Sequence, residues 1–249
     1  MILLPALALA ASMQSPAPAP ARSGAAYTAF LEALSLREAG RLDEALAALQ
    51  RVLRSDPKAA DALAEIAKIQ ALQNRFDLAA ATIGRAIEMA PGRADLRSVA
   101  GRVHQLAAQN GGGEKELRLA VADLEKAAEL SPGEPAPLRD LTRLYSVLRD
   151  TKGALGAWRR LAEADPRNVD ALIEVATLSV DAGDTDGAVK ALEGAIALDP
   201  EDSRSLQMLG EIQQKAGRVE EALAKYQAAA KLDPSDLAAQ KNHAFRVAA

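Results

Sequence analysis

Cysteine is absent from the sequence, and aromatic side chains are scarce. Without a thiol the chain cannot form disulfides, thiolate zinc sites or iron–sulfur clusters, and it cannot use a cysteine nucleophile. Aromatic residues make up only 3% of the 249 residues while hydrophobic residues make up 49%, so the core has to consist of aliphatic side chains. Small aliphatic residues favour closely packed helices over a sandwich or barrel, whose strands prefer β-branched and aromatic side chains.

A large excess of one charge is also missing, since the formal net charge is −4. This balance does not indicate a general affinity for nucleic acid or for anionic lipid. The sequence has two histidines, too few for a histidine-based metal cluster. We therefore expect no cofactor, no bound metal and no nucleic-acid partner.

Long hydrophobic runs are missing as well, apart from a short one at the start. Residues 1–11 are apolar, but a membrane-spanning helix needs about 20 such residues, so we expect no membrane span. The run matches the hydrophobic region of a secretory signal, with a small-x-small cleavage site at residues 8–10. We predict a signal peptide at residues 1–12, a Pro/Ala-rich linker at 13–23 and a periplasmic or secreted protein. Without cleavage the predicted location is the cytoplasm.

Prolines recur along the rest of the chain at intervals of 34 residues, with one interval of 41. An alanine stands twelve residues before each of them, and a large apolar residue stands eight residues before. These offsets place both side chains on one face of a helix, which the proline ends. Apolar positions further upstream predict a second helix, so each unit is expected to be a helical hairpin. The prolines are Pro57, Pro91, Pro132, Pro166, Pro200 and Pro234.

A turn is expected between the two helices of each unit, where a residue in the left-handed conformation ends the first helix. The longer interval adds seven residues to the third unit, around the glycine run at residues 111–113. This run followed by Lys115 lacks the spacing, the hydroxyl residue and the preceding strand of a phosphate-binding loop, so we interpret it as a lengthened surface turn. The expected turn residues of the other units are Gly40, Asn74, Arg149, Gly183 and Gly217.

The 34-residue period, the Gly-Arg-Leu-Asp-Glu-Ala motif at residues 40–45 and the Leu-Asp-Pro endings at 198–200 and 232–234 resemble the tetratricopeptide repeat family. The resemblance covers about residues 26–234. It implies an all-α fold, an α-solenoid of six helical hairpins that stack into a right-handed superhelix with a C-terminal capping helix. We expect the repeat domain at residues 24–249. Its repeats are expected at about 26–59, 60–93, 94–134 with the seven-residue insertion, 135–168, 169–202 and 203–236, followed by the cap at 237–249.

The resemblance also implies where a partner binds, because certain positions of the first helices line a concave groove in this family. The matching positions hold a basic strip with apolar side chains at its N-terminal end. Arginine side chains suit a partner that carries carboxylates. The implied partner-binding residues are Lys68, Arg102, Arg139 and Arg143 in the strip, and Tyr27 and Phe30 at the apolar end.

Three functional interpretations follow. The first is a non-catalytic protein–protein interaction module that binds a peptide or helix of another protein, in a bacterial envelope-assembly or secretion complex if the chain is exported. The alternative is a self-associating scaffold, a homo-oligomer that stacks through Tyr27 and Phe30. The remote alternative is an enzyme, but the sequence offers no cluster of nucleophile, base or metal ligands, and we expect no catalytic residues.

Overall fold

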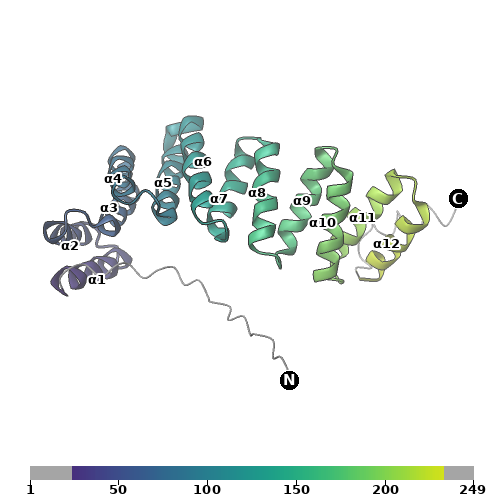
Figure 1. The fold of residues 1–249 in the computed structure, drawn as a ribbon, viewed down its shortest axis with the longest axis horizontal. Helices are drawn as coiled ribbons and strands as arrows, with labels where there is room; N and C mark the ends of the chain where they lie inside the picture. The colour runs from purple at the N-terminus through teal and green to yellow at the C-terminus, as the bar shows by residue number, and fades with distance from the viewer. Residues whose placement is uncertain (1–23, 233–249) are drawn as a thin grey trace, which may run out of the picture. The chain divides into compact units, whose positions relative to one another are not determined.

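The computed structural model describes residues 24–232, and in this range every regular element is a helix (Figure 1). Successive helices pack in pairs, which makes six helical hairpins and confirms the predicted class of fold. The predicted signal peptide, linker and capping helix lie outside the described residues. The hairpins are α1 (Gly24–Glu38) with α2 (Leu42–Ser55), α3 (Ala60–Leu72) with α4 (Phe76–Met89), α5 (Ala94–Ala107) with α6 (Gly113–Leu130), α7 (Pro135–Val147) with α8 (Thr151–Ala164), α9 (Val169–Asp181) with α10 (Thr185–Leu198), and α11 (Ser203–Lys215) with α12 (Val219–Leu232).

The contacts divide the chain into two compact units, residues 1–91 (unit 1) and residues 92–249 (unit 2). The described part of unit 1 holds two hairpins, α1 to α4, and that of unit 2 holds four, α5 to α12. Within each unit the second helix of one hairpin packs on the first helix of the next, as α6 does on α7 and α8 does on α9. Each hairpin thereby covers the apolar face of its neighbour, which is how an α-solenoid builds its core.

The predicted turn residues all adopt positive φ. The angles are 74° at Gly40, 78° at Gly183 and 77° at Gly217, and 59° and 56° at Asn74 and Arg149. One backbone hydrogen bond recurs at each of these turns: the residue that follows the turn residue donates to the carbonyl five positions earlier in the chain. This bond is the mark of a Schellman motif, which satisfies a carbonyl that the helix end leaves open.

Small side chains lie where the two helices of a hairpin touch. The six predicted alanines, from Ala45 to Ala222, are all at most 3% exposed. The space between the helices is smaller still at Gly101 and Gly210 on the facing first helices. A Cβ at Gly101 would lie 2.6 Å from Leu124, and a Cβ at Gly210 would lie 2.7 Å from Tyr226. The helix axes can therefore approach closely only because these positions carry little or no side chain.

Trp158 is half-buried and packs against two neighbouring apolar clusters of unit 2. One cluster includes Leu141 and Leu161 of the α7–α8 hairpin, and the other includes Val175 and Leu192 of the α9–α10 hairpin. The tryptophan therefore joins two hairpins, which confirms that its position faces the core.

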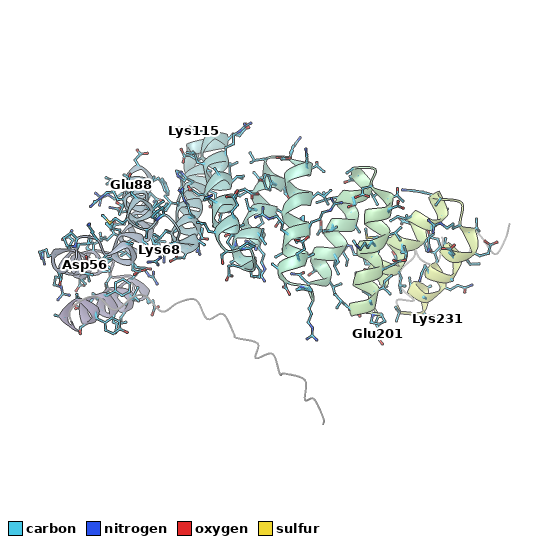
Figure 2. All side chains as sticks on the ribbon, in the orientation of Figure 1. Asp56, Lys68, Glu88, Lys115, Glu201 and Lys231 are labelled. Carbon is cyan, nitrogen blue, oxygen red and sulfur yellow. The ribbon has the colours of Figure 1, made fainter. Side chains whose placement is uncertain are left out.

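The seven-residue insertion is part turn and part helix. Its glycine run is exposed and has positive φ at Gly111 (105°) and Gly113 (64°), where the irregular segment η1 (Ala108–Gly112) ends in a kink, and this confirms the lengthened surface turn. The insertion also lengthens α6, which has 18 residues where each other second helix has 14. The reason is that residues 114–119 are good helix formers, and Glu114 and Glu116 in the first turn favour the positive end of the helix dipole. Lys115 is exposed at the end of this hairpin (Figure 2).

Candidate partner-binding face

The three predicted arginines of unit 2 lie on its first helices. Arg102 is on α5, and Arg139 and Arg143 are one turn apart on α7; we call these three side chains the basic row. All three are exposed, the side chains of Arg139 and Arg143 to 51% and 71%. The fourth predicted cation, Lys68, belongs to α3 of unit 1.

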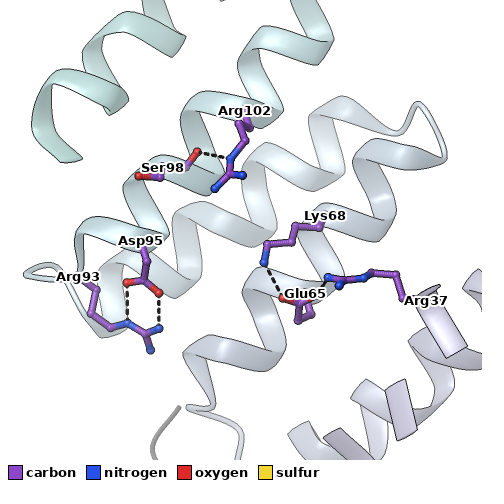
Figure 3. A network of polar contacts seen from close by, with 7 residues as sticks. All are labelled: Arg37, Glu65, Lys68, Arg93, Asp95, Ser98 and Arg102. Atoms are coloured by element: carbon purple, nitrogen blue, oxygen red, sulfur yellow. Dashed lines mark hydrogen bonds and ion pairs between the residues drawn. The ribbon is translucent and has the colours of Figure 1, made fainter. Parts of the chain in front are cut away.

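The basic row has only weak partners. Arg139 lies 3.8 Å from a carboxylate oxygen of Asp165, and Arg143 lies 3.5 Å from one of Asp140. Exposed ion pairs of this length contribute little, because solvent screens them and both side chains stay mobile. Arg102 donates to the backbone carbonyl of Ser98 at 3.4 Å, and no carboxylate of the described residues pairs with it (Figure 3).

A carboxylate near the start of α5 is engaged elsewhere. Asp95 accepts a hydrogen bond of 3.0 Å from Nε of Arg93, as Figure 3 shows. Burial by itself would raise the pKa of Asp95, but the hydrogen bond and the charge of Arg93 outweigh it and hold that pKa below its usual value. The carboxylate of Asp95 is therefore ionised and hydrogen-bonded to Arg93, and it does not pair with Arg102.

Lys68 is held much more firmly than the basic row. Its Nζ lies 2.6 Å from Oε1 of Glu65, and the other oxygen of Glu65 accepts from Arg37 (Figure 3). Glu65 is only 8% exposed, so a nearly buried carboxylate lies between two cations and links α1 to α3. The sequence analysis did not single out Glu65 or Arg37, and their contact joins residues 28 positions apart in the chain.

The two aromatic residues predicted to bind a partner differ in exposure. Tyr27 is 43% exposed on α1. Phe30 is half-buried and packs against an apolar cluster of unit 1 that includes Ala33, Leu49 and Ile66. Tyr27 therefore offers its ring to solvent, whereas much of Phe30 belongs to the core of unit 1.

The sequence analysis missed a second row of side chains on the first helices of unit 2. Leu106, Val147 and Val180 are apolar yet 36%, 66% and 38% exposed, and we call them the apolar row. Leu106 and Val147 each follow an arginine of the basic row by four residues, and Val180 stands near the same place at the end of α9. The signal that could have revealed Leu106 and Val147 is the repeat register, because the 41 residues that separate them also separate Pro91 from Pro132. Val180 lies one residue out of this register, since 34 residues after Val147 stands Asp181.

His104 takes part in a polar network between α5 and α6. Its Nδ1 lies 2.7 Å from a carboxylate oxygen of Glu116, and its Nε2 lies 3.8 Å from one of Asp123. Asp123 also accepts from Arg97 at 2.8 Å. The imidazole is therefore a polar group satisfied inside a hairpin.

Residues 24–232 contain no cluster of three metal-ligating side chains. No helix in this range has both the length and the apolar character that a membrane crossing requires.

Comparison with known proteins decides the family. The tetratricopeptide repeat family matches residues 30–94 and 174–236, just over half of the chain. The chain belongs to the tetratricopeptide repeat (TPR) family. No curated protein matches it. Proteins of the TPR family are in general non-catalytic and mediate contacts between proteins, which agrees with the interaction-module interpretation at this level.

Solved structures share the fold of this TPR protein at low sequence identity. YrrB, described as a TPR protein with an unusual peptide-binding site, is 19% identical with a TM-score of 0.55, over 80% of this chain and 97% of its own. PilF of Pseudomonas aeruginosa is 17% identical with a TM-score of 0.52, over 90% and 98% of the two chains. A chain of the Naa15/Naa10 complex bound to HypK-THB is 21% identical with a TM-score of 0.71 over 90% of this chain, which spans only 34% of that one.

Proposed function

We propose that this TPR protein is a non-catalytic adaptor that binds an acidic segment of another protein on the first helices of unit 2. The observation that carries the proposal is the basic row, three exposed arginines whose own ion pairs are long or absent. The predicted contacts Lys68 and Tyr27 belong to unit 1 and are not part of this proposal, and Lys68 is already held by Glu65.

The chemistry of arginine supports this choice of partner. A guanidinium group presents several N–H donors in a planar fork that matches a carboxylate, and such charge-assisted hydrogen bonds are stronger than neutral ones. The three groups stand on helices whose backbones are fixed by the hairpin packing, so little order has to be created when a partner binds. The long contacts of Arg139 and Arg143 are weak enough for a partner carboxylate to replace them.

Export and a role in an envelope-assembly or secretion complex are part of the proposal as well. They depend on the apolar run at residues 1–11 alone, and mass spectrometry of the N-terminus of the protein purified from its native source would test the export.

The test of the acidic partner is a charge reversal with a matched control. A fluorescent 16-residue poly-glutamate peptide serves as the probe, and its anisotropy is measured as the full-length protein is titrated at low salt. The variant Arg102→Glu/Arg139→Glu/Arg143→Glu should lose at least about tenfold in affinity, because three attractive contacts become repulsive. The control reverses three other exposed arginines of unit 2 in the variant Arg118→Glu/Arg167→Glu/Arg218→Glu, which has the same net charge.

The control should keep most of the affinity, and circular dichroism should show equal helix content in all three proteins. Equal weakening by both variants would mean that only the overall charge attracts the peptide. That result would remove the basic row from the proposal.

The self-associating scaffold is the alternative function, and one observation favours it. Tyr27 and Leu31, one turn apart on α1, are 43% and 47% exposed. Light scattering over a range of protein concentrations decides the matter. A constant mass of one chain would exclude the scaffold, and a mass that rises with concentration and falls back in Tyr27→Ser/Leu31→Ser would support it.

A further inference from the structure

Asn110 and Gly111 are neighbours in the chain at the point where the backbone leaves its helical path. Asn110 has φ −102° and ψ 27°, and Gly111 has φ 105° and ψ −2°, so these two residues form the kink near the end of η1. Both are exposed, and two more exposed glycines follow them. Glycine has no Cβ to restrict rotation about its backbone bonds, so this run changes conformation more readily than a helix does.

An asparagine that is followed by glycine can react with its own backbone. The peptide nitrogen of the glycine attacks Cγ of the asparagine, a new C–N bond forms, and the bond from Cγ to Nδ2 breaks. Ammonia leaves with the proton of the attacking nitrogen, and a five-membered succinimide ring remains. Water then opens the ring at one of its two carbonyls, which yields aspartate or isoaspartate. The reaction replaces an amide by a carboxylate and so adds one negative charge.

The structure distinguishes Asn110 from the other two asparagines of residues 24–232. Asn74 is followed by Arg75, whose backbone N–H donates to the carbonyl of Gln70 at 2.8 Å. Asn168 is half-buried, its side chain caps the start of α9, and the next residue is a β-branched valine. In both places a hydrogen bond holds one of the reacting groups, and the side chain of the next residue crowds the attack. At Asn110 the next residue has no side chain.

The side chain of Asn110 makes one hydrogen bond to the backbone. Its Nδ2 donates to the carbonyl of Leu106 at 2.9 Å, at the exposed C-terminal end of α5. An exposed hydrogen bond of this kind exchanges with bonds to water, so it does not keep the side chain from the nitrogen of Gly111. The bond is lost when Nδ2 leaves as ammonia. A carboxylate in its place is repelled by the carbonyl of Leu106 and by the negative end of the dipole of α5.

We propose that Asn110 is a site of spontaneous chemical modification, at which attack by the nitrogen of Gly111 converts the asparagine to aspartate or isoaspartate and loosens the end of the α5–α6 hairpin. The reaction consumes only water and proceeds with time, so an aged molecule carries one more negative charge at this turn than a new one. The proposal is independent of the proposed function, because it concerns the chemistry of the turn and not the partner of the basic row.

Peptide mapping by mass spectrometry tests the proposal on the full-length protein. The protein is incubated in mildly alkaline buffer made with water that carries heavy oxygen, returned to ordinary water and digested beside a sample that was not incubated. The peptide that contains Asn110 should gain a carboxylate with one heavy oxygen, in part as isoaspartate, while the peptides with Asn74 and Asn168 keep their amides. No conversion at Asn110, or equal conversion at all three asparagines, would overturn the proposal.

Two glycine variants test whether the nitrogen of Gly111 is the attacking atom. Gly111 and Gly113 both have positive φ, and a Cβ at either would meet nothing within 4 Å, so alanine strains the backbone at both without a clash. Gly111→Ala should lose the conversion at Asn110, because the new side chain crowds the attacking nitrogen. The control Gly113→Ala should keep it. Equal conversion in the two variants would overturn the proposal.

Asn110→Asp reproduces one product and tests the loosening of the hairpin. Hydrogen exchange measured by mass spectrometry should be faster at residues 106–113 than in the natural sequence, because the donor to Leu106 is gone, and it should be unchanged in α8. The control Gln109→Glu adds the same charge at the neighbouring exposed position and should leave the exchange as it is. Equal exchange in Asn110→Asp and Gln109→Glu would overturn the loosening that the proposal includes.

Discussion

Gly210 provides a sharp test of how the helices of a hairpin pack. In an open helix interior, replacing glycine by alanine stabilises by about 1 kcal/mol, because glycine loses more backbone freedom on folding. At Gly210, however, an added Cβ would lie 2.7 Å from one ring carbon of Tyr226 and 3.0 and 3.1 Å from two others. The two effects oppose each other, and the structure decides which is larger.

The ring of Tyr226 has little room to move away. It is 1% exposed, and its hydroxyl donates to Oε1 of Gln214 at 2.9 Å. An ordinary carbon–carbon contact is about 3.5 Å or more, so the ring would have to shift by about 0.8 Å. Overpacking of this kind costs about 1–3 kcal/mol. After the gain in helix propensity is subtracted, Gly210→Ala should lower the free energy of unfolding by about 1 kcal/mol.

A second substitution should reverse the effect. The fifth hairpin has alanine and leucine at the same two positions, Ala176 and Leu192, and both are fully buried. Gly210→Ala/Tyr226→Leu copies that pair. Tyr226→Leu alone leaves a space and should destabilise, so the double variant should be more stable than the sum of the two single effects predicts.

Hydrogen exchange measured by mass spectrometry is the suitable assay, because it reports the opening of α11 and α12 separately from the other hairpins. Gly156→Ala is the control, since a Cβ there meets nothing within 4 Å, and it should slow exchange in α8. If Gly210→Ala slowed exchange in α11 as Gly156→Ala does in α8, the close approach of the two helices would not limit side-chain size, and the packing argument would be refuted.

Three further predictions concern polar contacts. The pKa of Asp184 is held below its usual value chiefly by the N–H of Gly187, so the stability that this carboxylate contributes is complete above about pH 4 and is lost as the pH falls further. Asp184→Asn should therefore flatten acid unfolding below about pH 4, and an unchanged curve would contradict this. Glu65→Ala leaves Arg37 and Lys68 without their nearly buried carboxylate, and it should lower the free energy of unfolding by about 2 kcal/mol in urea titrations. An unchanged free energy of unfolding would show that the network does not stabilise the fold. The hydroxyl of Tyr145 donates to Glu125 at 2.8 Å, and its pKa is raised by burial first and then by this hydrogen bond, so the hydroxyl stays protonated. Tyr145→Phe should lower the free energy of unfolding by about 1 kcal/mol in the same titrations. No loss would mean that the hydrogen bond does not stabilise the contact between the two hairpins.

Periodic features could be predicted because they repeat. The turn residues Gly40 and Arg149 were found from their place between two helical patterns, although arginine has no intrinsic preference for positive φ. The buried alanines followed from the same register. One departure from the period was predicted only in part, since the glycine run near Gly111 is the expected turn but the insertion also lengthens α6. A single irregular segment has no second copy to confirm its structure.

The candidate site was predicted only in part. The resemblance located Arg102, Arg139 and Arg143 at positions that the structure leaves exposed. It did not distinguish them from Lys68, because Lys68 and Arg143 both have a carboxylate three residues earlier on the same helix. Only the structure shows that Glu65 holds Lys68 at 2.6 Å while Asp140 lies 3.5 Å from Arg143. The apolar row was missed for a related reason, since a leucine or valine at the end of a helix is buried or exposed according to the neighbour that covers it.

The sequence by itself determined the all-helical repeat, the hairpin turns and the absence of cysteine chemistry, because these depend on local spacing and on residue type. The tertiary structure alone decided which charges are already paired and which apolar side chains face water. Both properties depend on distances between residues far apart in the chain, and such distances exist only after the hairpins have stacked.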